Sequence, residues 1–336
     1  MRPVKARPLA LSAGDPAGIG AEIIAKAWQA LRERGPSFVV IGDAQLLASA
    51  GAGVKVRVVT GPDAAPEVFG EALPVIDIPL LSPVVAGRPS PTYAPQVIRW
   101  IETGVGLALS GAVSGLVTAP IAKAPLYEAG FKFPGHTEFL AELTAAERFE
   151  GARGPVMMLA AGDLRATLVT IHTSLAKVPG ALTIESVVNS GLVTAQALRK
   201  DFGVERPRLA VAALNPHAGE GGALGREEIE IITPAVRALR DLGVDAIGPA
   251  PADTLFHAEA RERYDGVLCM YHDQALIPVK MLDFWGGVNV TLGLPIVRAS
   301  PDHGTGFDIA GRGIARPDSL IAAIKLADEI AARRGA

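Results

Sequence analysis

Short, nearly uncharged runs alternate along the chain with longer stretches in which apolar residues recur at the spacing of a helix face. Residues 8–12 and 38–43 are runs of the first kind, and residues 21–34 form a stretch of the second kind. A short apolar run predicts a buried strand, and apolar residues at helical spacing predict an amphipathic helix. The alternation of the two therefore predicts layered α/β structure.

The later part of the chain continues this pattern with one departure. Residues 156–160 and 164–171 are strand-like runs on either side of Ala161-Gly162-Asp163, a sequence that predicts the turn of a hairpin. Gly135-His136-Thr137-Glu138 is expected to open a further helix, with Thr137 as its N-cap. The remaining predictions are helices at 93–110, 183–201 and 226–242, and strands at 115–118, 208–214 and 267–272.

The longest uncharged segment, residues 104–122, approaches the length of a membrane span. Its small and polar residues and its strand-like second half instead predict a buried helix followed by a strand, so no membrane is expected as a partner. Residues 1–7 carry the charges of a leader peptide, but the apolar run behind them breaks at Gly14-Asp15, too early for a secretion signal. We therefore expect a cytoplasmic protein.

Composition supports a globular protein with sizeable cores. The 336 residues permit one large or two medium domains, and 49% of them are hydrophobic. The 32 basic and 35 acidic residues give a formal charge of −3 without a basic stripe, so nucleic acid is not an expected partner. The single cysteine, Cys269, excludes an intrachain disulfide and fits a reducing compartment, and its apolar surroundings predict a small buried side chain.

Three of the six histidines, His172, His217 and His272, each follow an apolar run that predicts a strand. Ligands gather at the carboxyl ends of strands in α/β sheets, so neighbouring strands would bring these imidazoles to one edge. Three neutral imidazoles bind zinc or a similar first-row ion better than magnesium or calcium. Asp253 and Asp273 are candidate carboxylates for fixing the imidazole tautomers. For each histidine taken alone, a hydrogen-bonded structural role remains the alternative.

Other polar residues predict an anionic substrate. His136 and Thr137 stand at an expected helix start, where backbone N–H groups and the helix dipole favour a phosphate or carboxylate. Ordinary capping is the alternative there, and the two are compatible. Lys280, Asn289 and Arg298 would add two cations and an amide, which suit a phosphorylated acid, although each alone is typical of a solvated surface.

Three common fingerprints are missing from the sequence. It contains no GxGxxG motif, no Gly-Lys pair of a Walker A loop, and no GxSxG elbow. An ordinary Rossmann dehydrogenase, a P-loop kinase and a serine hydrolase are therefore disfavoured.

Several longer motifs occur in a fixed order that covers the chain nearly end to end. They are GDPAGIGAEI from Gly14, VTAPIAKA from Val117, GHTEFLAE from Gly135, LNPHAGEGGALGREE from Leu214, GPAPADTLF from Gly248, and YHDQALIPVKML from Tyr271 with VNVTLGLPIVRASPDHGTGFDIAGRGIA after it. Together they resemble the 4-hydroxythreonine-4-phosphate dehydrogenase family. The tail around His303 also resembles the nucleotide loop of isopropylmalate and isocitrate dehydrogenases.

The resemblance implies a fold of two α/β/α domains with a deep cleft between them and an NAD site that lacks the Rossmann fingerprint. Residues 1–130 with 285–336 are expected to form the first domain, which includes the nucleotide loop. Residues 131–284 would form the second, with the metal ligands and the dimer contacts. An obligate homodimer whose active site draws on both chains is expected.

The resemblance also implies roles for individual residues. A zinc, cobalt or magnesium ion would be held by His172, His217 and His272. Substrate contacts would come from His136, Thr137, Lys280, Asn289 and Arg298. The expected catalytic residues are Lys280, for proton transfer or carboxylate binding, with Asp253 and Asp273. NAD or NADP would meet His303 and Asp308, the latter through the adenosine ribose.

The implied activity is the metal- and NAD-dependent oxidation of 4-phosphooxy-L-threonine at C3. The product, 2-amino-3-oxo-4-phosphooxybutanoate, would lose CO₂ to give 3-amino-2-oxopropyl phosphate in pyridoxal 5′-phosphate biosynthesis. After His172 the chain reads Thr173-Ser174-Leu175, where many members are more apolar. Oxidation of phosphothreonate, phosphoerythronate or an aromatic cis-dihydrodiol carboxylate is therefore an alternative. A phosphate acyltransferase and a non-catalytic sugar-phosphate binder are alternatives from other classes.

Overall fold

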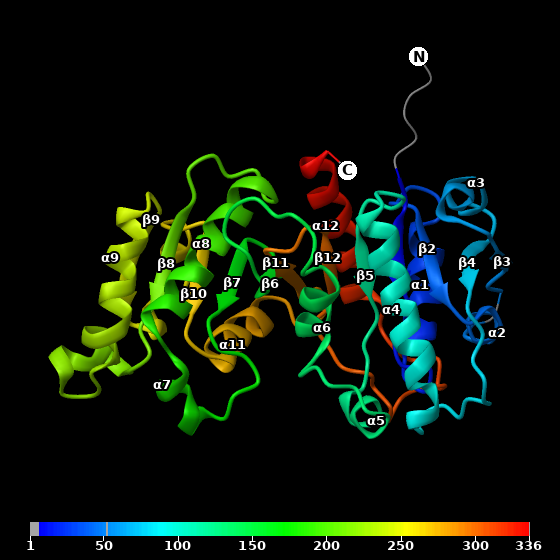
Figure 1. The fold of residues 1–336 in the computed structure, drawn as a ribbon, viewed down its shortest axis with the longest axis horizontal. Helices are drawn as coiled ribbons and strands as arrows, with labels where there is room; N and C mark the ends of the chain where they lie inside the picture. Colours follow the sequence, from blue (N-terminus) through cyan, green and yellow to red (C-terminus); the bar gives the residue numbers. More distant parts are fainter. Residues whose placement is uncertain (1–6, 52, 336) are drawn as a thin grey trace, which may run out of the picture. The chain divides into compact units, whose positions relative to one another are not determined.

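The computed structural model describes residues 7–51 and 53–335, so residues 1–6 of the leader-like segment lie outside the described residues. The chain forms two compact units, Met1–Glu147 with Pro295–Ala336, and Arg148–Leu294. In each unit helices cover the faces of a sheet, which confirms the α/β class (Figure 1).

The unit bounds differ from the expected domains, 1–130 with 285–336 and 131–284, for reasons of packing. Helix α6 (His136–Leu143) packs against α4 (Ala94–Leu109) and so stays in the first unit. Strand β11 (Val288–Leu292) pairs along its whole length with β6 (Val156–Ala161) and so stays in the second.

The first unit is built on parallel strands in the order β3-β4-β2-β1-β5-β12. The strands are β1 (Leu9–Ser12), β2 (Phe38–Gly42), β3 (Val56–Val58), β4 (Leu73–Asp77), β5 (Leu116–Thr118) and β12 (Arg298–Pro301). The helices, besides α4 and α6, are α1 (Gly20–Leu31), α2 (Ala44–Ser49), α3 (Ala65–Val68), α5 (Lys123–Glu128) and α12 (Asp318–Arg334). Every residue of β1 and β2 is buried, as their apolar runs predict.

The second unit has the strand order β11-β6-β7-β10-β8-β9. Its remaining strands are β7 (Leu164–Leu168), β8 (Arg208–Ala212), β9 (Asp245–Ala250) and β10 (Gly266–Cys269). Its helices are α7 (Val178–Ala181), α8 (Ile184–Lys200), α9 (Thr233–Asp241), α10 (Ala258–Arg261) and α11 (His272–Leu282). Strands β6 and β7 form the predicted antiparallel hairpin, whereas β7, β10, β8 and β9 run parallel.

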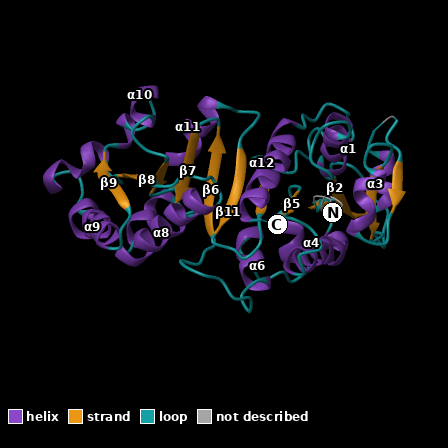
Figure 2. Ribbon diagram, turned by 90° about the horizontal axis from the view of Figure 1, so that it is seen from above, coloured by secondary structure: helices purple, strands orange, loops and turns teal. Residues whose placement is uncertain are grey.

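Side chains of the second sheet alternate between two cores, as the two-residue period of a strand requires. Leu209 and Val211 face a core that also includes residues of α8 and α9. Ala210, Val267 and Cys269 face the opposite core, which α11 closes. Figure 2 shows these helices on either side of the strands. Cys269 is fully buried, as predicted, and burial raises the pKa of its thiol.

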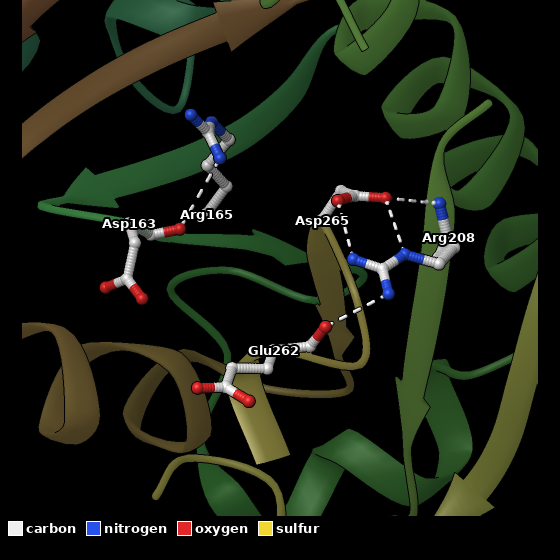
Figure 3. A network of polar contacts seen from close by, with 5 residues as sticks. All are labelled: Asp163, Arg165, Arg208, Glu262 and Asp265. Atoms are coloured by element: carbon white, nitrogen blue, oxygen red, sulfur yellow. Dashed lines mark hydrogen bonds and ion pairs between the residues drawn. The ribbon is translucent and has the colours of Figure 1, made fainter. Parts of the chain in front are cut away.

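An ion pair joins the amino ends of β8 and β10 (Figure 3). Arg208 opens β8, and its Nε and Nη2 donate to the two carboxylate oxygens of Asp265 at 3.2 and 3.0 Å. The backbone N–H of Arg208 donates to the same carboxylate at 2.8 Å. Burial alone would raise the pKa of Asp265, but these contacts outweigh it and lower that pKa. The ion pair therefore holds β8 and β10 together at their amino ends. The polar loops that follow these strands begin at the opposite edge of the sheet.

The segment from 104 to 122 contains the end of α4 and strand β5, as predicted. Within the described ranges, no helix is both long and apolar enough to cross a bilayer.

Candidate functional site

The three histidines after the strands of the second unit lie at one edge of its sheet. Strand β10 lies between β7 and β8, and the three run parallel, so their carboxyl ends meet at this edge. His172, His217 and His272, hereafter the strand-end histidines, follow these three ends. The ring centroids of His172 and His272 are 6.0 Å apart. The strands stop earlier than predicted, at Leu168, Ala212 and Cys269, because the chain turns out of the sheet before each histidine.

A buried amide ties the exit of β10 to that of β8. Gln274 accepts a hydrogen bond from the backbone N–H of Met270 at 2.7 Å and donates one to the Ala213 carbonyl at 2.7 Å. It lies two positions after His272, in the first turn of α11. The amide therefore sets where His272 stands relative to the loop that carries His217. Gln274 was not predicted from the sequence, where its only signal is its place in the YHDQ motif.

A buried carboxylate holds the loop that carries His217. Glu228 accepts hydrogen bonds from the backbone N–H groups of Leu214 and Asn215 at 2.8 and 2.7 Å, and from the Asn215 side chain at 3.0 Å. Its Oε2 lies so close to Gly219 that a Cβ there would come within 2.6 Å. Sequence reasoning missed this residue as well. The feature of the sequence that could have indicated Glu228 is its place as the second glutamate of GREE, which follows the NPHAGEGG motif.

His172 and His217 both have backbones in the left-handed region, with φ of 43° and 52°. Such a conformation costs a residue other than glycine about 1–3 kcal/mol, and it clusters at functional sites. The loop before His172 is held by Thr170, whose hydroxyl donates to the Met270 carbonyl at 2.7 Å. Held backbone strain at two histidines of one sheet edge supports a role beyond packing.

The two candidate carboxylates differ in their placement. Asp273 lies 2.7 Å from Nδ1 of His272, so it can fix the tautomer and leave Nε2 for a ligand. Asp253 is exposed in a short helical turn, Ala252–Thr254, that follows β9. The structure therefore pairs Asp273 with a strand-end histidine and places Asp253 at the end of the strand next to β8.

The strand-end histidines fit a divalent metal by donor type and by placement at one edge. Across the described parts of the chain, no three His, Cys, Asp or Glu side chains stand close enough together to enclose an ion. His172 and His217 are exposed, so their rings have room to turn. Nitrogen ligands of zinc lie at about 2.0–2.1 Å, so the imidazoles would have to swing inward around an ion.

Lys280 and Asn289 lie in the same unit as the strand-end histidines. Lys280 is in the last turn of α11, and its Nζ lies 5.3 Å from the ring centroid of Phe284. Asn289 is on β11 opposite Leu159. The buried Oδ1 of Asn289 has no hydrogen-bond partner among the described residues, which marks it as an atom available to a ligand.

The first unit contains His136, Thr137 and Arg298. Helix α6 begins at His136, with Gly135 as its N-cap, so the prediction of Thr137 as the cap was wrong. Gly135 has the extended backbone of a cap residue, and Thr137 falls within the first turn. No described side chain caps this helix start, which leaves its N–H groups to other acceptors. Nε2 of His136 is buried and likewise has no partner within the described ranges.

The electrostatics of this group favour an anion. Burial lowers the pKa of His136 well below its usual value, and the charges of Arg298 and Lys123 lower it further. Arg298 is buried, and its Nη2 donates to the Thr118 hydroxyl at 2.6 Å. Burial lowers the pKa of Arg298 to about 10, so it remains charged at neutral pH. Sequence reasoning singled out neither Lys123 nor Thr118, although both lie in the VTAPIAKA motif.

The loop after β12 carries His303 and Asp308, both exposed. Nδ1 of His303 lies 3.0 Å from the Gly304 carbonyl. The loop rests on the GDPAGIG turn, because Ile19 donates its backbone N–H to the Thr305 carbonyl at 2.9 Å. The predicted residues thus fall into two groups. The first unit holds His136, Thr137, Arg298, His303 and Asp308, and the second holds Lys280, Asn289, Asp253, Asp273 and the strand-end histidines.

Comparisons with known proteins agree with one another. The family model for the pyridoxal phosphate biosynthetic protein PdxA matches residues 34–327. The chain is 85% identical over 329 residues to a 4-hydroxythreonine-4-phosphate dehydrogenase of Caulobacter vibrioides, covering 98% of this chain and 99% of that protein. A crystal structure of the enzyme of that name from Klebsiella pneumoniae matches with 40% identity and a TM-score of 0.84, covering 98% and 99% of the two chains.

A more distant solved structure is also similar over nearly the whole chain. A terephthalate 1,2-cis-dihydrodiol dehydrogenase from Burkholderia xenovorans matches with 28% identity and a TM-score of 0.64, covering 97% of this chain and 98% of that one.

Proposed function

The chain belongs to the family of the pyridoxal phosphate biosynthetic protein PdxA, and from this premise we propose that it oxidises 4-phosphooxy-L-threonine at C3 with NAD. The product, 2-amino-3-oxo-4-phosphooxybutanoate, loses CO₂ to give 3-amino-2-oxopropyl phosphate for pyridoxal 5′-phosphate biosynthesis in the cytoplasm. The observation that carries the proposal is the placement of the strand-end histidines at one sheet edge, two of them with strained backbones.

Residues of the second unit are assigned to the reacting end of the substrate. The strand-end histidines would hold a zinc, cobalt or magnesium ion, which when bound supplies Lewis-acid chemistry. Asp273 orients His272. Hydride leaves C3 for the nicotinamide, and the hydroxyl proton must pass to a base. We assign Lys280 to that proton transfer or to the substrate carboxylate, and Asn289 to a hydrogen bond through its buried amide.

Residues of the first unit are assigned to the phosphate and the coenzyme. The uncapped start of α6 offers N–H groups of the kind that bind phosphate. His136, Thr137 and Arg298 are its proposed ligands. His303 and Asp308 are assigned to NAD or NADP, with Asp308 at the adenosine ribose. Their loop rests on the GDPAGIG turn at the carboxyl end of β1, and ligands collect at such strand ends.

We also propose that the protein is a homodimer whose active site draws on both chains. The exposed end of α11 and the loop after it form an apolar patch of Ile277, Met281, Phe284 and Trp285. Met281 is 82% exposed and Ile277 is 63% exposed. Contiguous apolar surface of this kind marks interaction sites. Because Lys280 lies within the patch, a partner that covers it would also shield a proposed catalytic residue from water.

The test is a substrate panel followed by nicotinamide absorbance. Purified protein with zinc, cobalt or magnesium should reduce NAD⁺ with 4-phosphooxy-L-threonine in preference to phosphothreonate, phosphoerythronate or dihydrodiol carboxylates. A preference for a dihydrodiol would favour the activity named for the Burkholderia structure. No reduction with any substrate would refute a dehydrogenase and return the acyltransferase and sugar-phosphate binder to consideration.

A further inference from the structure

Lys123 stands beside the start of α6 and has no role in the assignments above. It is the first residue of α5, directly after the Pro120–Ala122 segment that follows β5. A Cβ built on Gly135 would lie 3.4 Å from both Cε and Nζ of Lys123. Its ammonium therefore borders the residue that caps α6, and its charge is felt at His136.

A buried carboxyl group holds the backbone of the segment that carries Lys123. Asp15 accepts hydrogen bonds from the backbone N–H groups of Ala17, at 2.9 Å, and of Ala122. The Asp15 N–H in turn donates to the Pro120 carbonyl at 2.9 Å. The turn after β1 and the turn after β5 are thus joined, and the backbone immediately before Lys123 is held in place.

Three features at this place suit the binding of an anion. Helix α6 starts without a described side chain as its cap, so its first N–H groups face outward. Nε2 of His136 is buried without a partner in the described residues. Two cations, Lys123 and buried Arg298, bear on the same imidazole. A Cβ built on Gly135 would also lie 3.2 Å from Oε2 of Glu138, so charged side chains of both signs border the start of α6.

We propose that Lys123 is a further ligand of the substrate phosphate and that, with His136 and Arg298, it selects a dianionic phosphate over a carboxylate. This inference rests on the proposed function. A phosphate monoester carries about −1.5 to −2 charges at pH 7 and three acceptor oxygens, which match two cations and the N–H donors of His136 and α6. A carboxylate has one charge and two acceptor oxygens, so it would engage fewer of these donors.

Inorganic phosphate is the probe that separates this inference from the identity of the substrate. Its binding would be measured by isothermal titration calorimetry on the wild type, Lys123→Met, Lys123→Arg and Lys132→Met, an exposed lysine on the following loop. We expect wild type and Lys132→Met to bind alike and Lys123→Met to bind about 10-fold or more weakly, since charge-assisted contacts have that strength. Lys123→Arg should recover part of the affinity.

Kinetics with the oxidised substrate add a second readout. Lys123→Met should raise the KM for the phosphorylated substrate about 10-fold or more while the KM for NAD changes little. Wild-type phosphate affinity in a folded Lys123→Met protein, or no phosphate binding by the wild type, would overturn the inference. If phosphate binding depends on Lys123 but 4-phosphooxy-L-threonine is not oxidised, the proposed substrate fails and the anion site stands.

Discussion

Replacing Glu228 by alanine should unfold the His217 loop locally and destabilise the second unit. The carboxylate accepts three hydrogen bonds, two from backbone N–H groups and one from the Asn215 amide. A buried donor left without its acceptor costs about 1–3 kcal/mol. The loop is only part-buried, so water can reach some of these donors. We therefore expect the free energy of unfolding to fall by about 2–4 kcal/mol in total, where a typical protein has about 5–15 kcal/mol.

The same substitution should release the strained backbone beside it. His217, Ala218 and Glu220 have φ of 52°, 52° and 43°, and Glu228 holds the start of their loop. Without that anchor the loop can relax, and His217 would leave the place where it can share an ion. We therefore expect bound metal to fall along with stability. Glu228→Gln, which keeps one carbonyl oxygen for the two backbone donors, should lose only about 1–2 kcal/mol.

The assay is urea unfolding followed by far-ultraviolet circular dichroism, with metal content measured on the same samples. Glu230→Gln is the matched control, because Glu230 is exposed and pairs only with nearby Arg226 in the described structure. The free energy of unfolding of Glu230→Gln should stay within about 0.5 kcal/mol of the wild-type value. A loss below about 1 kcal/mol for Glu228→Ala, with unchanged metal content, would refute the reasoning.

Alanine at any of the strand-end histidines should abolish activity and lower bound metal while circular dichroism stays native; full metal content in all three variants would contradict the metal site. His136→Ala and Arg298→Ala should each weaken substrate binding about 10-fold or more without a matching loss for NAD, and equal losses for both ligands would argue against a phosphate site. Asp265→Asn should lower the free energy of unfolding by about 1–2 kcal/mol near pH 7, because the Arg208 contacts lower the Asp265 pKa. This stabilisation is present above the pKa of Asp265 in the unfolded chain and is lost as the pH falls through its pKa in the folded protein. The difference in unfolding free energy between variant and wild type should therefore narrow below about pH 4. Light scattering should give a dimer for the wild type and dissociation for Trp285→Glu, and a fully active wild-type monomer would end the dimer hypothesis.

The sequence predicted the alternation of strands and helices because that signal is local. Apolar runs such as residues 38–43 report burial directly, and β2 lies at Phe38–Gly42. The ends of elements were harder to place. Met270 and Tyr271 continue the apolar run of β10, yet the chain has already left the sheet there. Likewise, residues 226–242 read as one helix, but Glu228–Ile232 form a wider π turn before α9 begins.

The site was predictable only in part, because some of its residues act through contacts that are distant in the sequence. Histidines after strands are visible in a sequence, and so the edge where they gather could be expected. The residues that hold them in place are not. Glu228 acts on residues 13 and 14 positions away, and Gln274 reaches a carbonyl 61 positions away. A glutamate or glutamine at such positions looks like any surface residue until the fold brings its acceptors and donors together.

Strands β8 and β10 of the second unit are connected at both of their ends. Arg208 and Asp265 lock the strands at one end, and Gln274 locks them at the other. The sheet therefore sets the spacing between the loops that carry His217 and His272. The loop before His172 is likewise joined to the end of β10, through the Thr170 hydroxyl. At the proposed metal site, adjustment to the radius of an ion would then fall to the imidazole rings rather than to the loops that carry them.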